Sequence, residues 1–289
     1  MPPRDQSPTP AAVSMVLGAI VSIQVGAAVA TELFSEIGPA GVVFMRALVS
    51  AVLLVAIWRP SFRIPREHVR ITLLFGVALT GMNLAFYESI DRIPLGTAVT
   101  FEFIGPLSVA LITSRRRRDW TWAGMAAVGI VLLTGGIGGG DLDPLGVGLA
   151  LVAGFFWGSY ILLGKRVGRQ ASGGKRLAVA MTISAVLTAP FGIADGGIEL
   201  LGPEVLAVGI AVGLLSSALP FSLEMEAMRR LPSSVFGVMM SLEPAVAATV
   251  GFVLLGQGLI PREGLAILLV VAASAGALRS NRAPAPVEP

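Results

Sequence analysis

Two stretches of this chain, 138 residues apart, carry the same pattern of prolines and charges. Residues 92–118 read RIPLGTAVTFEFIGPLSVALITSRRRR, and the second stretch opens at Arg230-Leu231-Pro232 and is interrupted by Glu243-Pro244. Four pairs of identical residues coincide at this one spacing: Glu88 with Glu226, Arg92 with Arg230, Pro94 with Pro232, and Pro106 with Pro244. Such a repeat in so apolar a chain predicts a duplicated structural unit.

The composition indicates where that unit folds. Charged residues make up 13% of the chain and hydrophobic residues 54%, with a mean hydropathy of +0.81. Soluble domains carry about 25% charged residues, so a polytopic membrane protein is predicted. The chain has no cysteine and one histidine, His68 in a basic loop. These counts argue against a thiolate or histidine metal site and against a catalytic triad, and we expect no cofactor and no enzymatic activity.

Ten apolar windows have the length of about 20 residues that a membrane-crossing helix needs. They are 12–31, 39–58, 71–89, 95–114, 120–137, 145–164, 177–194, 204–222, 233–255 and 263–279. The sequence therefore predicts an all-α membrane protein of ten transmembrane helices. Five helices fall in each copy of the repeat, at 11–140 and 141–280, and disordered tails are expected at 1–10 and 281–289.

An odd number of helices in each copy requires the second copy to sit inverted relative to the first. Many secondary transporters are built in this way, with the substrate site near the midplane between the copies. A cleaved signal peptide is the alternative interpretation of the first window, which follows Arg4 and ends near Ala28-Val29-Ala30. That window is long for a signal peptide, and its removal would spoil the duplication, so we expect it to be a span.

The basic residues predict the orientation. With the N-terminus in the cytoplasm, 18 of the 21 basic residues fall in cytoplasmic segments: Arg4, Arg59, Arg63, Arg66, Arg70, Arg115, Arg116, Arg117, Arg118, Lys165, Arg166, Arg169, Lys175, Arg176, Arg229, Arg230, Arg279 and Arg282. The outer loops hold Arg92 and Arg262. This is a positive-inside bias, and it predicts that both termini are cytoplasmic. We interpret the arginine run at 115–118 as a topology anchor rather than a lipid or nucleic-acid site, despite a pI near 9.9.

Three ionisable residues fall well inside the predicted spans. A charge at the bilayer centre costs about 3 kcal/mol on insertion scales, so it usually faces a cavity or a partner. Glu102 lies in the span 95–114, Glu243 in the span 233–255, and Arg46 in the span 39–58. The structural alternatives are an ordinary buried hydrogen bond for each glutamate and a salt bridge from Arg46 to Glu102 or Glu243. Glu88, Glu224 and Glu226 lie near span ends, where an interfacial carboxylate is equally expected.

Prolines accompany both glutamates. Proline has no N–H, so Pro106 frees the carbonyl of Glu102 and Pro244 frees that of Met240. A carboxylate beside a helix kink in two matched helices is expected of a midplane site, although packing kinks are common. Further polar or aromatic candidates for such a site are Gln24, Asn83, Tyr87, Trp157, Tyr160 and Ser241. Gly154 and Gly158 have the spacing of a close helix contact, whose usual meaning is packing.

Motifs throughout the chain resemble the drug/metabolite transporter superfamily, EamA type, and within it the threonine/homoserine exporter (RhtA-like) branch. They are Ser22-Ile23-Gln24 with Gly26-Ala27, Gly81-Met82-Asn83 with Phe86-Tyr87, Pro94-Leu95-Gly96, Glu102-Phe103 with Gly105-Pro106-Leu107, the run from Ala218 to Met225, Phe236-Gly237, and the run from Met239 to Ala245. Arg46, Glu102 and Glu243 match the family pattern, whereas the four-arginine run, which is longer than topology needs, is a departure from it. The resemblance implies ten helices, an inner-membrane location and efflux of small amino acids or related metabolites, driven by a proton gradient.

The residues allow a concrete mechanism. Arg46 would hold the carboxylate of a zwitterion in a bidentate contact, and Glu102 or Glu243 would hold its ammonium group. Exclusion of water favours the neutral form of a carboxyl group, so a proton could compete with the substrate for the same glutamate, which is antiport. The alternatives are a broad-specificity metabolite or drug exporter, a uniporter, and a membrane-embedded enzyme or scaffold. The expected partners are a small-molecule substrate, protons and the lipid bilayer; a homodimer is left open, and no nucleic acid is expected.

Overall fold

The computed structural model describes residues 10–113, 119–133, 142–168, 173–231, 236 and 239–280. These residues form helices and connecting turns, and no strand occurs among them. The helices are α1 (Pro10–Thr31), α2 (Phe34–Trp58), α3 (Arg66–Ile90), α4 (Leu95–Glu102), α5 (Ile104–Thr113), α6 (Asp119–Leu133), α7 (Pro144–Gly168), α8 (Gly173–Gly196), η1 (Gly197–Leu201), α9 (Pro203–Gly213), η2 (Leu214–Ala218), α10 (Leu219–Arg230), α12 (Glu243–Leu254) and α13 (Pro261–Ser280). The predictions for the tails at 1–9 and 281–289, for the arginines at 115–118 and for Pro232 lie outside the described residues.

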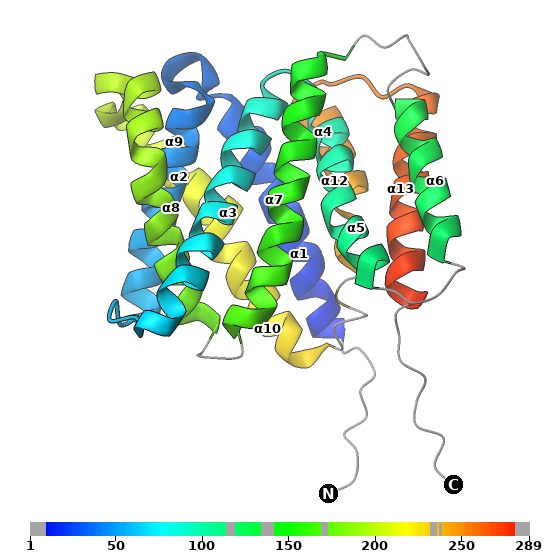
Figure 1. Ribbon diagram of the computed structural model, residues 1–289. Coiled ribbons are helices and arrows are strands. Elements are labelled where there is room, and N and C mark those ends of the chain that lie inside the picture. The colour runs from blue at the N-terminus through cyan, green and yellow to red at the C-terminus, as the bar shows by residue number, and fades with distance from the viewer. Residues whose placement is uncertain are drawn as a thin grey trace, which may run out of the picture.

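The helices run side by side between two ends of the molecule (Figure 1). Six helical segments are long and apolar enough to cross a membrane, namely Pro10–Thr31, Phe34–Trp58, Arg66–Ile90, Pro144–Gly164, Gly174–Leu201 and Pro203–Glu224. Three shorter apolar segments accompany them: Leu95–Val109, Trp120–Leu132 and Glu243–Leu254. Helix occurs within each of the ten predicted windows. The chain is thus a multi-pass membrane protein, and the full count of ten crossings stays a prediction.

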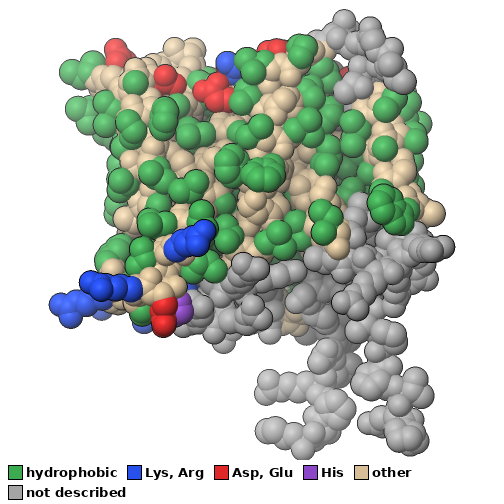
Figure 2. Space-filling model, in the orientation of Figure 1, with side chains coloured by type: hydrophobic (Ala, Val, Ile, Leu, Met, Phe, Trp, Pro, Cys, Tyr) green, Lys and Arg blue, Asp and Glu red, His purple; other side chains and the backbone are tan. Residues whose placement is uncertain are grey.

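The outer surface fits a bilayer. Large apolar side chains such as Val52, Leu73, Phe155 and Phe191 are exposed along the helices, and they cover the middle of the molecule in Figure 2. Charged side chains gather at the two ends, with mainly basic ones at the lower end of that view and mainly acidic ones at the upper end. The link between α2 and α3 lies at the basic end; its exposed arginines are Arg59 and Arg63, and Arg66 follows at the start of α3.

Helix packing follows a paired pattern. The α2 helix packs mainly against α8, α6 against α13, and α4 against α12. The α3 helix packs mainly against α7, while α1 packs against the continuous segment formed by α9, η2 and α10. Each contact therefore joins a helix of the first half of the chain to one of the second half. The two halves form one interlocked bundle rather than two separate bodies.

Two helical segments break near the matched prolines. The α4 helix ends at Glu102 and α5 begins at Ile104, so the chain turns at Phe103, three residues before Pro106. In the second half the chain turns at Ser241 and Leu242, and α12 begins at Glu243. The breaks fall at the same 138-residue spacing as the sequence repeat. Each one places a glutamate at a helix end inside the bundle.

A close contact between backbones holds the first break in place. A Cβ atom built on Gly105 would lie 1.8 Å from the carbonyl oxygen of Gly154 in α7, and one built on Gly154 would lie 2.6 Å from the carbonyl oxygen of Glu102. Only glycine allows this approach at both positions. The packing role predicted for Gly154 is confirmed, and the contact fixes where Glu102 sits relative to α7.

Candidate functional site

A cavity of about 120 Å³ lies in the middle of the bundle. It is lined by Ile23, Gln24, Arg46, Met82, Asn83, Phe86, Val99, Glu102, Trp157, Tyr160, Ser216, Phe221, Glu224, Met240 and Glu243. Four helices present two of these residues three positions apart, a spacing that puts both on one helix face. The four pairs are Asn83/Phe86, Val99/Glu102, Trp157/Tyr160 and Phe221/Glu224. The cavity therefore draws on both halves of the chain.

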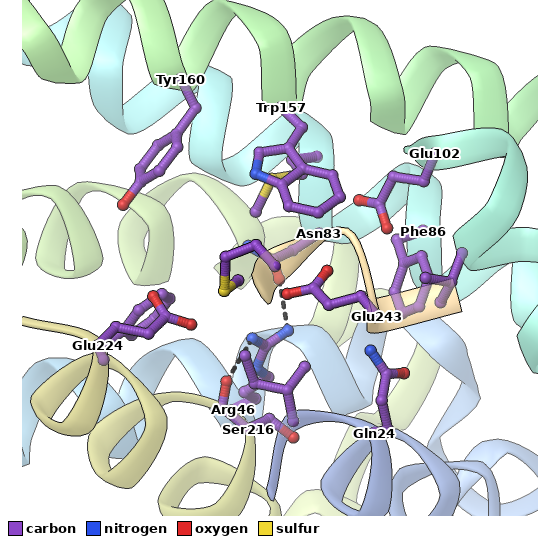
Figure 3. Close-up of a pocket in the computed structure, with 15 residues that line it drawn as sticks. Gln24, Arg46, Asn83, Phe86, Glu102, Trp157, Tyr160, Ser216, Glu224 and Glu243 are labelled. Atoms are coloured by element: carbon purple, nitrogen blue, oxygen red, sulfur yellow. Dashed lines mark hydrogen bonds between the residues drawn. The ribbon is translucent and has the colours of Figure 1, made fainter. Parts of the chain in front are cut away.

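Arg46 is held at the wall of this cavity by neutral groups. Its Nε donates to Ser217 Oγ at 3.0 Å, its Nη2 donates to the carbonyl oxygen of Ser216 at 2.8 Å, and its Nη1 donates to Asn83 Oδ1. Figure 3 shows the last two bonds. The guanidinium also lies 5.4 Å from the ring centroid of Tyr87, within range of a cation–π contact. These partners fix the side chain without neutralising its charge.

The backbone acceptor for Arg46 exists because of a proline. An α-helix would bond the carbonyl of Ser216 to the N–H four residues later, but that residue is Pro220, which has no N–H. The turn that contains Ser216, η2, is a π-helix, a form that often marks functional sites in α-helices. The same turn bonds to the first half again, because Ser22 Oγ donates to the carbonyl of Leu215 at 2.6 Å.

Two donors of Arg46 remain for a ligand. A guanidinium has five N–H groups, and the three bonds above use one on Nε and one on each terminal nitrogen. One N–H is left on each terminal nitrogen. These two charged donors can bind the oxygens of a carboxylate.

Glu102 and Glu243 line the cavity but form no salt bridge with Arg46. Both side chains are buried, with 8% and 5% of their surface exposed. Among the described residues, no carboxylate oxygen lies within 4.0 Å of the Arg46 nitrogens. The alternative in which Arg46 pairs with Glu102 or Glu243 is therefore wrong, because Asn83, Ser216 and Ser217 take the role of the carboxylate. Both glutamates border the cavity beside Arg46.

The structure adds a third carboxyl group, for which the sequence left an interfacial position equally open. Glu224 lies in α10 and faces Tyr160 at one end of the cavity in Figure 3. Its position could have been found from spacing, since Ser217, Phe221 and Glu224 stand four and three residues apart and so share a helix face. The other two span-end glutamates instead form ion pairs within their own helices: Glu88 with Arg92 at 2.9 Å, and Glu226 with Arg230 at 2.7 Å.

The remaining predicted residues divide into two groups. Gln24, Asn83, Trp157 and Tyr160 line the cavity, and the two aromatic rings are held by neighbours: Trp157 meets Phe103 edge-on with centroids 5.2 Å apart, and Tyr160 stacks on Phe75 at 4.7 Å. Tyr87 and Ser241 do not line it. Tyr87 lies behind Arg46, and Ser241 lies in the break before α12.

The two ends of the cavity differ in exposure. Phe221, Glu224 and Tyr160 are partly exposed, whereas the side chains of Gln24 and Glu102 at the opposite end are buried. A mostly apolar cavity with a small number of polar side chains at each end is typical of a binding site for a small molecule.

Comparisons with known proteins agree with this architecture. A model of the EamA-like transporter family matches residues 144–279. The chain is 42% identical to a protein named threonine/homoserine exporter RhtA from Escherichia coli K12 over 93% of this chain and 91% of that protein, and equally to one of that name from Salmonella typhimurium LT2. It is 26% identical to the uncharacterized transporter YwfM of Bacillus subtilis over 76% of this chain and 77% of the relative. One crystal structure superimposes with a TM-score of 0.63 at 18% identity over 93% of this chain and 99% of the other, a likeness that shows the fold alone.

Proposed function

Because this chain belongs to the EamA-like transporter family, we propose that it is an inner-membrane secondary transporter that exports small amino acids, with threonine and homoserine as the leading substrates. Proton antiport through an alternating-access cycle would drive the export. The substrate class rests on the names of the relatives and on the chemistry of the central cavity.

The observation that carries this proposal is the combination of one guanidinium and carboxyl groups that form no salt bridge with it, all lining one cavity. The two remaining N–H groups of Arg46 suit the carboxylate of an amino acid, and Glu243 or Glu102 suits its ammonium group. A cavity of about 120 Å³ is small beside the roughly 300–1,000 Å³ of drug-sized sites. This size favours an amino acid over a bulky drug.

Coupling follows from the same carboxyl groups. A glutamate can hold a proton or an ammonium group but not both, so the two ligands exclude each other by linkage. A proton that enters from the outer side would release the amino acid outward, and its loss to the cytoplasm would restore the site. Glu102 and Glu243 are both proposed for this role.

The arrangement of helices supports two inverted repeats related by a pseudo-two-fold axis, with boundaries near 11–140 and 141–280. Under that symmetry α2 and α6 correspond to α8 and α13, and each packs against its own counterpart. The ion pairs Glu88–Arg92 and Glu226–Arg230 are also equivalent, and α3 and α10 end at opposite ends of the bundle. The basic end seen in Figure 2 would be cytoplasmic, with both termini on that side.

Transport in proteoliposomes under an imposed pH gradient tests the proposal. We expect the imposed proton gradient to drive labelled threonine across the membrane in the direction opposite to the proton flow. Glu102→Gln and Glu243→Gln should each lower this gradient-driven rate by tenfold or more. Glu199→Gln, an exposed residue of η1, is the matched control and should transport normally. Undiminished pH-driven transport in both site variants would refute the mechanism.

Competition separates the alternatives within the family. A broad-specificity metabolite or drug exporter would be inhibited comparably by amino acids, nucleotides and cationic drugs. A uniporter would transport threonine at a rate independent of the pH gradient. The proposed exporter should respond to short amino acids and to the gradient.

A further inference from the structure

Gln24 is the buried polar group of the cavity that the proposed mechanism leaves without a role. Its side chain is 2% exposed, and its Oε1 atom is enclosed with no hydrogen-bond partner. Figure 3 shows the amide at the closed end of the cavity, on the side opposite Tyr160 and Glu224. Buried polar atoms without partners are rare and call for an explanation. A ligand atom is one such explanation, because Gln24 lines the cavity and a half-turn of its amide, whose oxygen and nitrogen are nearly interchangeable in shape, would present the oxygen there.

The backbone that carries Gln24 is fixed on both sides. Two residues earlier, Ser22 donates to the carbonyl of Leu215 at 2.6 Å. Two residues later, Gly26 packs so closely on η2 that a Cβ atom there would lie 3.0 Å from the backbone nitrogen of Ser216. The backbone on either side of Gln24 is therefore held by the same π-helical turn that anchors Arg46. Binding groups mounted on rigid elements in this way give precise recognition.

We infer that Gln24 binds the side-chain hydroxyl of the substrate and so selects hydroxylated amino acids over apolar amino acids of the same shape. The inference deepens the proposed function and rests on it. With the zwitterion held by Arg46 and a glutamate, the short side chain enters the closed end among Ile23, Phe86 and Val99. These residues accept methylene and methyl groups, and the amide is the neutral polar side chain beside them.

An amide is a better partner for a hydroxyl group than for a methyl group. A hydroxyl both donates and accepts, so it can bond to the oxygen of the amide, to its nitrogen, or to both. A methyl group in the same place leaves the amide unbonded in a closed space. A site that bonds a substrate hydroxyl discriminates strongly against the analogue that lacks it, whereas a purely apolar pocket does not.

Two isosteric pairs provide the test. Valine replaces the hydroxyl of threonine by a methyl group, and norvaline does the same for homoserine. Inhibition of labelled threonine transport by each of the four would be measured in proteoliposomes for the wild type, Gln24→Leu and Gln24→Glu. Val21→Leu, on the exposed side of the same helix, is the matched control.

We expect the wild type and Val21→Leu to prefer each hydroxylated amino acid over its isostere by about tenfold or more. Gln24→Leu should reduce that ratio to about one, mainly through weaker binding of threonine and homoserine. Gln24→Glu keeps acceptor atoms and should retain part of the ratio. If Gln24→Leu does not reach the membrane, Gln24→Met, which keeps the length of the side chain, replaces it with the same expectation.

An unchanged ratio in Gln24→Leu would overturn the inference, and so would an equal loss of all four ligands, which would mean a structural role. Either outcome leaves the proposed function standing, because the wild type would still transport threonine. Absence of saturable threonine transport in the wild type would instead refute the proposed function.

Discussion

Single residues decide what this cavity can bind. Among the described residues that line it, Arg46 is the sole basic side chain, and it faces three carboxyl groups, those of Glu102, Glu224 and Glu243. Asn83, Ser216 and Ser217 position its guanidinium but bring no negative charge. The site therefore keeps one cationic group for a carboxylate and a surplus of anionic groups for ammonium or protons.

Glu224 gives a prediction at this scale. Glu224→Gln should lower threonine export by about fivefold, since loss of one favourable charge interaction near a partly exposed site is worth about 1 kcal/mol. Glu226→Gln, two residues later, removes the ion pair with Arg230 at the helix end and should leave export within twofold of wild type. Initial rates over a range of threonine concentrations would measure both. Equal effects of the two substitutions would contradict the assignment of Glu224 to the site.

Helix elements place these residues through two devices, a π-helical turn and broken helices. Pro220 leaves the carbonyl of Ser216 free for Arg46. The breaks before Pro106 and Pro244 put Glu102 and Glu243 at helix ends. In each case a missing N–H creates a polar position inside an apolar bundle.

Replacing Pro220 tests the first device. Pro220→Ala restores an N–H four residues after Ser216, which would compete with Arg46 for the same carbonyl oxygen. We expect threonine export to fall several-fold while the thermal midpoint in detergent stays the same or rises, because alanine favours helix. Pro190→Ala in α8, away from the residues that line the cavity, controls for proline removal. Normal export by Pro220→Ala would show that Arg46 does not depend on this acceptor.

Close backbone packing gives a second prediction for the elements. Gly154→Ala puts a methyl group 2.6 Å from the carbonyl oxygen of Glu102, so it should destabilise the protein by about 1–3 kcal/mol. Gly148→Ala in the same helix meets no atom within 4 Å and should be neutral or slightly stabilising. Thermal unfolding of the two purified variants makes the comparison. Equal midpoints would mean that α4 and α7 do not touch as described.

The whole molecule joins helices from both halves of the chain around one cavity. The break between α4 and α5 lies on α7, and α1 lies on η2, so each half completes the other. An alternating-access cycle in such a bundle would move the two halves relative to each other around the cavity.

Orientation can be tested directly because the chain has no cysteine. Single cysteines would replace Ser61, in the exposed link between α2 and α3, and Glu199, in η1 at the opposite end. A membrane-impermeant maleimide should label Glu199→Cys in spheroplasts and Ser61→Cys in inside-out vesicles. Labelling of both positions from one side would contradict a membrane-spanning bundle with a cytoplasmic basic end.

The sequence by itself determined the class of the protein and much of its cavity. The sequence signals were local or periodic: the apolar windows, the 138-residue spacing, and the ionisable residues Arg46, Glu102 and Glu243 inside the spans. Such signals can be read without the fold, because the cost of placing a polar group in lipid constrains each position separately. The family resemblance came from the same residues. Seven of the nine predicted binding residues line the cavity, which are Gln24, Arg46, Asn83, Glu102, Trp157, Tyr160 and Glu243.

Only the tertiary structure decided which partners these residues meet. The sequence left open a salt bridge from Arg46 to a glutamate, and the folded chain supplies Asn83 and the turn at Ser216 instead. In the folded chain Tyr87 packs against Arg46 and does not line the cavity, whereas Glu224 does. Arg46 and its partners Ser216 and Ser217 are about 170 residues apart in the sequence, so their contact depends on the angle and rotation at which their helices pack. Close packing at glycines, such as Gly26 on η2 and Gly105 on α7, fixes this arrangement of helices.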